Sequence, residues 1–373
     1  MRIAVNTRFL LSRGLEGIGW YTHEVLRCMV EQHPEDEFLF LFDRPFDPKY
    51  VFGDNVETQV VFPPARHPFL WWVWFEVSLP NVLRKWKPDV FFSPDGYLSI
   101  RSVVPTVMVM HDLAYRHFPA QVPNLVYRYY EYYTPRFLQR AEEVLAVSEA
   151  TRRDIKNQFG DLNTPISVAP NGVRSVFRTI SEPEKEEVRQ RYAAGDPYFF
   201  YVGAIHPRKN VARLIRAFDQ FKRETGSKTR LLLAGRLAWQ TGAVEEALRQ
   251  TSYREHIHLV GYLDQEELRC CLAAARALTY VSLFEGFGVP LLEAMWTETP
   301  ILTSQTSSMP EVAGDAGLLV DPTSEHSIAE GLRRLDQEPD LRENLVEKGL
   351  LQRTKYAWNS TSERVYDALL RVK

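Results

Sequence analysis

The stretch Ala277–Trp296, ALTYVSLFEGFGVPLLEAMW, is the most informative for the fold class. Its apolar run Ala277–Val281 predicts a buried strand, and the loop after Ser282 leads into a helical pattern over Val289–Trp296. Pro290 fits the first turn of that helix, where the missing N–H of proline costs no hydrogen bond. A strand, a glycine-rich loop and a helix in this order form one βα unit of a parallel sheet.

The same alternation runs through the rest of the chain. Further strands are predicted at Arg2–Asn6, Phe38–Phe42, Thr58–Phe62, Val90–Ser93, Thr106–Met110, Glu143–Val147, Ile166–Ala169, Phe199–Val202, Arg230–Ala234, Ile257–Val260, Ile301–Thr303 and Gly317–Val320. Helical patterns lie between them, as at Gly19–Glu31, Leu125–Arg140, Val211–Glu224 and Ser327–Gln337. The pattern predicts an α/β protein with two Rossmann-like, doubly wound halves that bind ligands at the carboxyl ends of their strands.

A polar stretch at Ser181–Asp196 separates the two halves and predicts the domain linker at 181–196. The N-terminal domain is then expected at 1–180 and the C-terminal domain at 197–355. The remaining residues, 356–373, contain a helix that is long enough to pack on either half, so a return to the N-terminal domain is left open.

Composition narrows the class of protein. The chain has 373 residues, of which 45% are hydrophobic and 25% charged, which excludes a disordered or fibrous protein. Its 45 Lys and Arg against 48 Asp and Glu argue against nucleic acid as the main partner. Three cysteines do not support a disulfide framework, and the sequence has neither a signal-peptide pattern nor a membrane span, so we expect a cytoplasmic protein.

Three segments carry candidate chemistry. Arg208 and Lys209 follow a predicted strand end and precede a helix, which suits them to bind a phosphate, although a solvated basic turn is the alternative. Glu285 and Glu293 flank a helix N-terminus, where two carboxylates can accept hydrogen bonds from the hydroxyls of one ligand. The glycine-rich loop 14–19 is equally compatible with a phosphate loop and with a plain flexible loop.

Together these segments resemble the retaining GT-B glycosyltransferases of the family 4 type. The carboxylates of EGFGVPLLE (285–293) match the E-x7-E signature of that family, and HPRKN (206–210) resembles its diphosphate-binding turn. The glycines of 17–19 resemble the family's N-terminal phosphate loop, while AVSE (146–149) and PNGV (170–173) resemble its interdomain landmarks. The resemblance covers nearly the whole chain and implies the GT-B fold, with a central cleft between the domains.

The resemblance also implies roles for single residues. Glu293 would hold the nucleotide ribose, Glu285 the donor sugar, and Arg208 with Lys209 the diphosphate, while His111 would contact the donor sugar near the reaction centre. A core histidine is the alternative for His111. The other residues expected at the donor site are Gly17, Gly19, Gly203, Gly286, Phe287, Gly288 and Val289, with Arg236 and Tyr262 as candidates for the base pocket. Ala204 stands where some members carry a further arginine, so the diphosphate depends more on Arg208 and Lys209.

The mechanism implied by the resemblance is transfer with retention, in which the leaving phosphate helps to deprotonate the acceptor. The sequence contains no Asp-x-Asp motif of the kind that metal-dependent glycosyltransferases use, so we expect no metal and no cofactor. Positive charge on Arg208 and Lys209, together with the helix N-terminus, would then stabilise the leaving group.

The donor and the acceptor are expected from the same resemblance. The GIG and HPRKN variants look most like bacterial mannosyltransferases of polysaccharide synthesis, which makes GDP-mannose the first expectation and UDP-glucose the second. The acceptor would be a glycan or a lipid-linked sugar. The aromatic stretch 66–87 is interpreted first as a helix packed on the N-terminal sheet. The alternative is an acceptor site formed by Trp71, Trp72 and Trp74, with peripheral contact at the inner face of the membrane.

Two other classes of protein stay open. A sugar-nucleotide epimerase or hydrolase on the same fold would act on the donor without an acceptor. A nicotinamide dehydrogenase is suggested by Gly17, Gly19 and Asp43, but it would leave Glu285 and Glu293 without a role.

Overall fold

The computed structural model describes residues 1–12, 14–236 and 242–373, which form two compact units. The first unit contains Met1–Gly172 together with Ala357–Lys373, and the second contains Val173–Tyr356. The chain therefore leaves the first unit after Gly172 and returns to it after Tyr356. The stretch expected to be a linker, 181–196, lies inside the second unit.

A parallel sheet of seven strands forms the centre of the first unit, in the order β3-β2-β1-β4-β5-β6-β7 among the described residues. Its strands are β1 (Arg2–Asn6), β2 (Glu37–Phe42), β3 (Val56–Val60), β4 (Val90–Ser93), β5 (Thr106–Met110), β6 (Glu143–Ala146) and β7 (Ile166–Val168). The central strands are buried along nearly their whole length, which is why they are recognisable as apolar runs. β1 pairs with β2 on one side and with β4 on the other, so the strand order reverses there.

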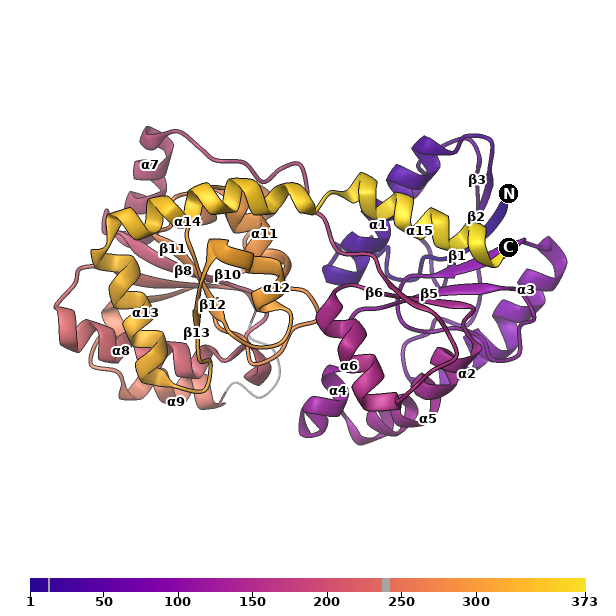
Figure 1. Cartoon of the computed structure of the whole chain (residues 1–373), viewed down its shortest axis with the longest axis horizontal. Helices are drawn as coiled ribbons and strands as arrows, with labels where there is room; N and C mark the ends of the chain where they lie inside the picture. The colour runs from indigo at the N-terminus through magenta and orange to yellow at the C-terminus, as the bar shows by residue number, and fades with distance from the viewer. Residues whose placement is uncertain (13, 237–241) are drawn as a thin grey trace. The chain divides into compact units, whose positions relative to one another are not determined.

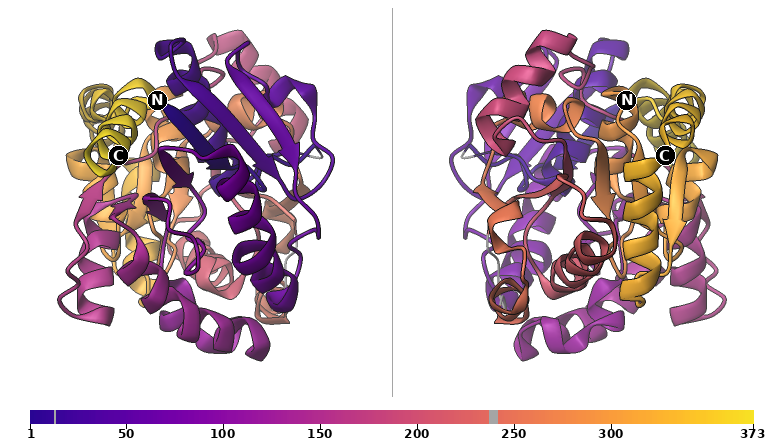
Figure 2. Two further views of the ribbon diagram at one scale, coloured as in Figure 1. Left: turned by 90° about the vertical axis from the view of Figure 1, so that its right-hand side faces the viewer. Right: turned by 90° about the vertical axis from the view of Figure 1, so that its left-hand side faces the viewer.

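Helices cover this sheet on the two faces, as crossover connections between parallel strands require (Figure 1, Figure 2). They are α1 (Gly17–Gln32), α2 (Pro68–Val73), α3 (Leu79–Trp86), α4 (Ala114–His117), α5 (Asn124–Arg140), α6 (Glu149–Phe159) and α15 (Trp358–Val372), with short turns at Pro48–Tyr50 and Pro119–Gln121. The C-terminal helix α15 runs beside α1, where the Ser362 hydroxyl donates to the Val25 carbonyl oxygen at 3.1 Å.

The tryptophan-rich stretch is continuous helical structure, in which a π-helical turn at Trp74–Ser78 joins α2 to α3. Trp74 is fully buried and its indole N–H donates to the Val61 carbonyl oxygen at 3.0 Å. The expectation that Trp74 contacts an acceptor is therefore wrong, because its ring packs in the core of the unit. Trp71 and Trp72 are half-buried.

A second parallel sheet forms the centre of the second unit, with six strands among the described residues, in the order β10-β9-β8-β11-β12-β13. They are β8 (Tyr198–Val202), β9 (Arg230–Ala234), β10 (Ile257–Gly261), β11 (Ala277–Tyr280), β12 (Ile301–Ser304) and β13 (Gly317–Val320). Its helices are α7 (Glu182–Ala193), α8 (Val211–Thr225), α9 (Gly242–Gln250), α10 (Gln265–Ala273), α11 (Val289–Trp296), α12 (Met309–Ala313), α13 (Glu325–Gln337) and α14 (Pro339–Gln352), with short turns at Pro207–Lys209, Arg254–His256, Gly314–Ala316 and Arg353–Lys355.

The polar stretch before β8 is helix α7 rather than an irregular linker. Ser181 and Glu184 form a capping box at its start, and the Arg191 guanidinium pairs with Glu267 of α10 at 2.9 Å. The helix carries polar side chains on most of its sides, so its sequence lacks the apolar stripe that marks a packed helix.

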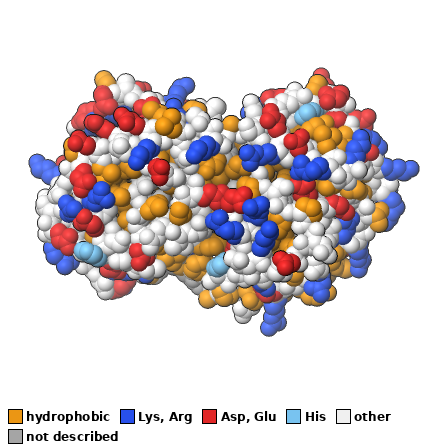
Figure 3. Space-filling model, in the orientation of Figure 1, with side chains coloured by type: hydrophobic (Ala, Val, Ile, Leu, Met, Phe, Trp, Pro, Cys, Tyr) orange, Lys and Arg blue, Asp and Glu red, His pale blue; other side chains and the backbone are white. Residues whose placement is uncertain are grey.

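Charged side chains of both signs are interspersed over the face shown in Figure 3, in keeping with the net charge of −3. Among the described residues, no helix is both long enough and apolar enough to cross a membrane.

Candidate functional site

The second sheet reverses its strand order at β8, which pairs with β9 on one side and with β11 on the other. Open parallel sheets bind ligands beyond the carboxyl ends of their strands at such a reversal. The loops that leave β8 and β11 at this edge are residues 203–210 and 281–288. They contain both predicted cations and the first predicted carboxylate.

Two glycines allow the loop after β8 and the loop after β9 to approach each other closely. Gly203 and Gly235 have φ angles of +143° and +139°, and a Cβ atom on Gly235 would lie 1.9 Å from the Gly203 carbonyl oxygen. The Ile205 N–H donates to the Arg236 carbonyl oxygen at 3.0 Å, which fixes the loop after β9 beside the loop after β8. Arg236 is exposed, as is Tyr262, which keeps 81% of its surface accessible.

Arg208, Lys209 and Glu285 form one ion-pair cluster, in which Glu285 is buried and the two cations are half-buried. The Arg208 Nη1 atom lies 3.0 Å from Glu285 Oε2, and Lys209 Nζ lies 2.5 Å from Glu285 Oε1. Burial by itself raises the pKa of Glu285, but the charges of Lys209 and Arg208 outweigh it and lower that pKa to about 2. The cluster therefore has two cations and one carboxylate, which leaves one net positive charge at the switch point.

Tyr280, the last residue of β11, completes this cluster. Its hydroxyl donates to Glu285 Oε1 at 3.0 Å and accepts from Lys209 Nζ at 2.7 Å, and the side chain is buried. Burial also raises the pKa of Tyr280 well above its ordinary value, so the hydroxyl stays protonated. The sequence gives no sign of this contact, because a tyrosine at the end of an apolar strand has the pattern of a core residue.

The loop 285–288 is held from behind by two serines. The Glu285 N–H donates to Ser307 Oγ at 3.0 Å, and the Ser308 hydroxyl donates to the carbonyl oxygens of Glu285 and Phe287. Gly288 precedes α11 with a φ of +98°, and a Cβ atom there would lie 2.6 Å from Met309 Cε. Val289 begins α11, so the predicted segment 286–289 forms the N-terminal approach to a buried helix.

Glu293 lies on α11 and is also buried, with 4% of its surface exposed. It pairs with Arg174, whose Nη2 lies 2.6 Å from Glu293 Oε1. The Arg174 guanidinium also lies over the Phe177 ring, 4.7 Å from its centroid. The sequence does not predict this pair, because Arg174 and Glu293 are 119 residues apart, although Arg174 directly follows the PNGV landmark.

His111 lies in the first unit, directly after β5. Its Nε2 atom is 2.8 Å from the Pro94 carbonyl oxygen, and since a carbonyl only accepts, the proton is on Nε2. Burial lowers the pKa of His111, which favours the neutral ring with Nδ1 as its acceptor nitrogen. The ring also makes an edge contact with Tyr21 at 5.2 Å between centroids.

The glycines of the predicted N-terminal loop have different environments. Gly17 is the first residue of α1, and a Cβ atom there would meet nothing within 4 Å. Gly19 lies in the first turn, where a Cβ atom would come within 2.8 Å of the Phe9 carbonyl oxygen. A close backbone approach therefore explains Gly19.

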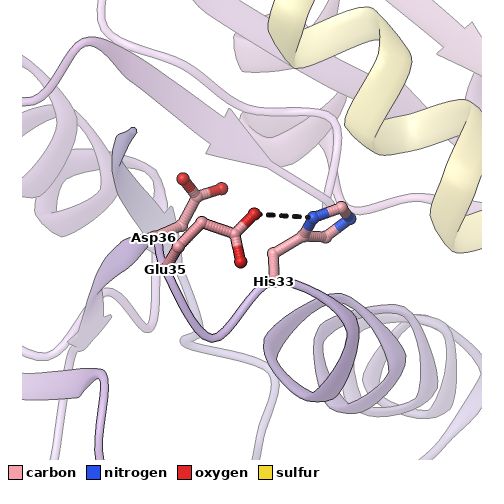
Figure 4. A group of neighbouring side chains, drawn as sticks. All are labelled: His33, Glu35 and Asp36. Atoms are coloured by element: carbon pink, nitrogen blue, oxygen red, sulfur yellow. Dashed lines mark ion pairs between the residues drawn. The ribbon is translucent and has the colours of Figure 1, made fainter.

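A separate cluster of potential metal ligands, His33, Glu35 and Asp36, lies in the turn between α1 and β2 (Figure 4). His33 Nδ1 is 3.5 Å from Glu35 Oε1, and the ring stacks on Tyr366 of α15 with 3.5 Å between centroids. Asp36 accepts from the Tyr366 hydroxyl at 2.7 Å. These contacts join α15 to the first sheet and explain the cluster as structural.

Solved structures have the same architecture of two parallel α/β units, which is the GT-B fold. A sucrose-phosphate synthase from Thermosynechococcus elongatus superposes with a TM-score of 0.80 at 17% identity, covering 100% of both chains. Anabaena Alr3699/HepE in complex with UDP-glucose superposes with a TM-score of 0.75 at 15% identity, also over 100% of both chains.

Sequence comparisons then define the family. Residues 15–177 match the model described as Glycosyltransferase Family 4, and residues 184–352 match that of Glycosyl transferases group 1. O-antigen chain mannosyltransferase B of Escherichia coli is 31% identical over 287 residues, which cover 77% of this chain and 75% of that protein. An MMP alpha-(1->4)-mannosyltransferase of Mycolicibacterium hassiacum is 30% identical over 61% of this chain and 53% of that protein. The chain belongs to the family 4 type of GT-B glycosyltransferases, as its motifs predict.

Proposed function

We propose that this glycosyltransferase moves mannose from GDP-mannose to a hydroxyl group of a glycan or lipid-linked acceptor, with retention of the anomeric configuration and without a metal ion. The observation that carries the proposal is the cluster of Arg208, Lys209 and Glu285 at the switch point of the second sheet. Relatives named as mannosyltransferases favour mannose as the sugar.

The diphosphate of the donor binds Arg208 and Lys209 in this proposal. Both cations are held by Glu285, so their positions are fixed before the ligand arrives. The backbone turn at Gly203 and the N-terminal approach to α11, residues 286–289, line the same edge of the sheet. A helix N-terminus there adds partial positive charge and unpaired N–H donors for an anion.

The ribose of the donor binds Glu293, and Arg174 holds that carboxylate in place. An ionised carboxylate accepts hydrogen bonds from two vicinal hydroxyls, and its pairing with Arg174 through Oε1 leaves Oε2 as an acceptor for them. Arg236 and Tyr262 are proposed to contact the base. Their exposure allows contact with a flat ring, although it does not distinguish guanine from uracil. HepE, solved with UDP-glucose, makes UDP-glucose the second donor.

In the proposed reaction, the bond from the anomeric carbon to the diphosphate oxygen breaks and a bond to the acceptor oxygen forms on the same face. The acceptor proton goes to an oxygen of the leaving phosphate, and Arg208 and Lys209 stabilise the charge that develops there. Glu285 accepts from the sugar hydroxyls. His111 supplies its Nδ1 atom as a further hydrogen-bond acceptor for the donor sugar.

The acceptor is assigned to the first unit, with Trp71 and Trp72 as candidate contacts. Peripheral membrane contact is proposed for the helix that carries them, because Phe69 beside them is 64% exposed and Arg66 is exposed too. Sedimentation with anionic liposomes tests this part. Loss of binding in Phe69→Ser is the expected result, and unchanged binding would contradict it.

Release of GDP from GDP-mannose, measured with and without p-nitrophenyl α-mannoside, tests the function itself. We expect release to depend on the acceptor, product NMR to show the α-anomer, and Lys209→Gln to lose activity. Lys185→Gln is the matched control, because Lys185 makes a similar pair with Glu182 on exposed α7. GDP release at the same rate with and without the acceptor would instead favour a hydrolase.

A further inference from the structure

The first sheet has its own switch point, at β1, and a buried arginine lies directly beyond it. β1 ends at Asn6 and pairs with β2 and β4, and the chain beyond β1 carries Arg8 while the chain beyond β4 carries Asp95. Arg8 keeps 6% of its surface exposed, and so does Asp95. This is the place where an open parallel sheet binds ligands.

Among the described residues, Asp95 is the carboxylate that accepts a hydrogen bond from the Arg8 guanidinium. Its Nε atom lies 2.5 Å from Asp95 Oδ2. A guanidinium carries five N–H donors, and no acceptor among the described residues makes a hydrogen bond with Nη1 or Nη2. Neither nitrogen is among the fully buried polar atoms without a partner, so both remain open to an oxygen from outside the protein, such as a ligand hydroxyl.

Aromatic rings surround the same guanidinium. Its Cζ atom lies 4.2 Å from the centroid of Tyr97 and 5.1 Å from those of Phe9 and Phe75. Trp71 follows in the next layer, with its ring centroid 5.6 Å from that of Tyr97. Ring faces beside fixed hydrogen-bond donors are suited to a sugar, which has apolar C–H faces and a rim of hydroxyls.

The charge around Arg8 selects between a sugar and a phosphate. Asp95 balances Arg8, and the neighbouring Asp43 is balanced by the bidentate Arg44, so the four groups sum to zero. A phosphate would bring uncompensated negative charge into a buried site, which is costly. Hydroxyl oxygens accept from Nη1 and Nη2 without that cost.

We infer that Arg8, set by Asp95 and flanked by Tyr97, binds the hydroxyls of a neutral sugar residue of the acceptor. The inference rests on the proposed function and specifies the acceptor as a glycan end rather than a phosphate group. Arg8 therefore determines acceptor affinity, whereas the diphosphate and the ribose of the donor are bound by residues of the second unit.

Saturation-transfer NMR with methyl α-mannoside tests the inference, with Arg8→Lys as the variant. Lysine keeps the charge but loses the planar fork, so we expect the affinity for the probe to fall about tenfold while GDP-mannose affinity is unchanged. The matched control is Arg116→Lys, since Arg116 also pairs with a carboxylate, Glu131, and lies over a ring, Phe159. Equal probe binding in wild type and Arg8→Lys would overturn the inference.

A second variant keeps the test decisive where Arg8→Lys fails to fold. Asp95→Asn preserves shape but leaves Arg8 uncompensated, so inorganic phosphate should compete with methyl α-mannoside in this variant and not in wild type. Phosphate competition of equal strength in both proteins would overturn the neutral-sugar assignment. GDP-mannose titration on the same samples reports separately on the proposed function, because absence of GDP-mannose binding by wild type would refute that function and not the binding of the probe at Arg8.

Discussion

Replacing Glu285 by glutamine separates two roles of this carboxylate: it competes with the diphosphate for Arg208 and Lys209, and it accepts hydrogen bonds from the donor sugar. In the structure Glu285 is the counter-charge of Arg208 and Lys209. The amide keeps the shape of the side chain and removes its negative charge. We therefore expect Glu285→Gln to bind GDP more tightly than wild type, because a diphosphate no longer competes with a carboxylate for the two cations.

The size of this effect follows from the pKa of Glu285. Burial alone raises that pKa, yet Lys209 and Arg208 lower it from 4.5 to about 2. At ~1.36 kcal/mol for each pKa unit, this decrease corresponds to a net stabilisation of the charged carboxylate on the order of 3 kcal/mol, which sets the scale of the attraction that a bound diphosphate can replace. In the variant Arg208 keeps its hydrogen bond to the Phe284 carbonyl oxygen and Lys209 keeps its hydrogen bond to Tyr280. These bonds still stabilise the two cations without ligand, so the gain in GDP affinity is smaller than the full attraction. We expect GDP affinity to rise about tenfold.

Calorimetric titration of GDP into both proteins measures this change, and mannose transfer by the variant should fall by at least about a hundredfold. Glu267→Gln is the matched control, because Glu267 also accepts from an arginine and a tyrosine, Arg191 and Tyr192, away from the site. Equal or weaker GDP binding by Glu285→Gln would refute the assignment of the diphosphate to Arg208 and Lys209.

Four further predictions follow from the same geometry. Tyr280→Phe removes the hydroxyl that joins Lys209 to Glu285, so KM for GDP-mannose should rise about tenfold with the melting temperature nearly unchanged; an unaltered KM would contradict this. Gly235→Ala should unfold the second unit or lower its stability by more than about 3 kcal/mol in urea titrations, since a Cβ atom would lie 1.9 Å from a carbonyl oxygen. GDP release should continue in EDTA; a complete loss restored by Mg²⁺ or Mn²⁺ would show that the cations alone do not suffice. Burial and nearby cations lower the pKa of His256, so the folded protein favours the neutral ring. Its contribution to stability is therefore complete above pH ~6.5 and is lost as the pH falls below that value. His256→Asn should lessen this loss of stability in acid, as measured by unfolding curves at several pH values.

The sheets could be predicted because parallel strands are buried on both faces. Apolar runs such as Phe38–Phe42 and Leu231–Ala234 therefore stand out from their surroundings, and the observed strands lie within two residues of the predicted ones at either end. The closeness of Arg208, Lys209 and Glu285 could be predicted as well, since each follows the carboxyl end of a strand.

Other features depend on tertiary neighbours and left no local signal. Helix α7 has polar residues on most sides, so its sequence resembles that of a linker. The sequence around Trp74 fits both a core helix and an acceptor site, and only the burial of its ring distinguishes them. The pairing of Glu293 with Arg174 joins positions 119 residues apart. The roles of Tyr280 and Arg8 follow only from the atoms that contact them in the folded protein.

Calorimetric titration of GDP-mannose into wild type and Glu293→Ala tests the central claim most directly, with Glu347→Ala on the exposed face of α14 as the control. We predict a single donor site in wild type and in the control, weakened at least about tenfold in Glu293→Ala. Equal affinity in all three proteins, or no binding of GDP-mannose by wild type, would contradict the account.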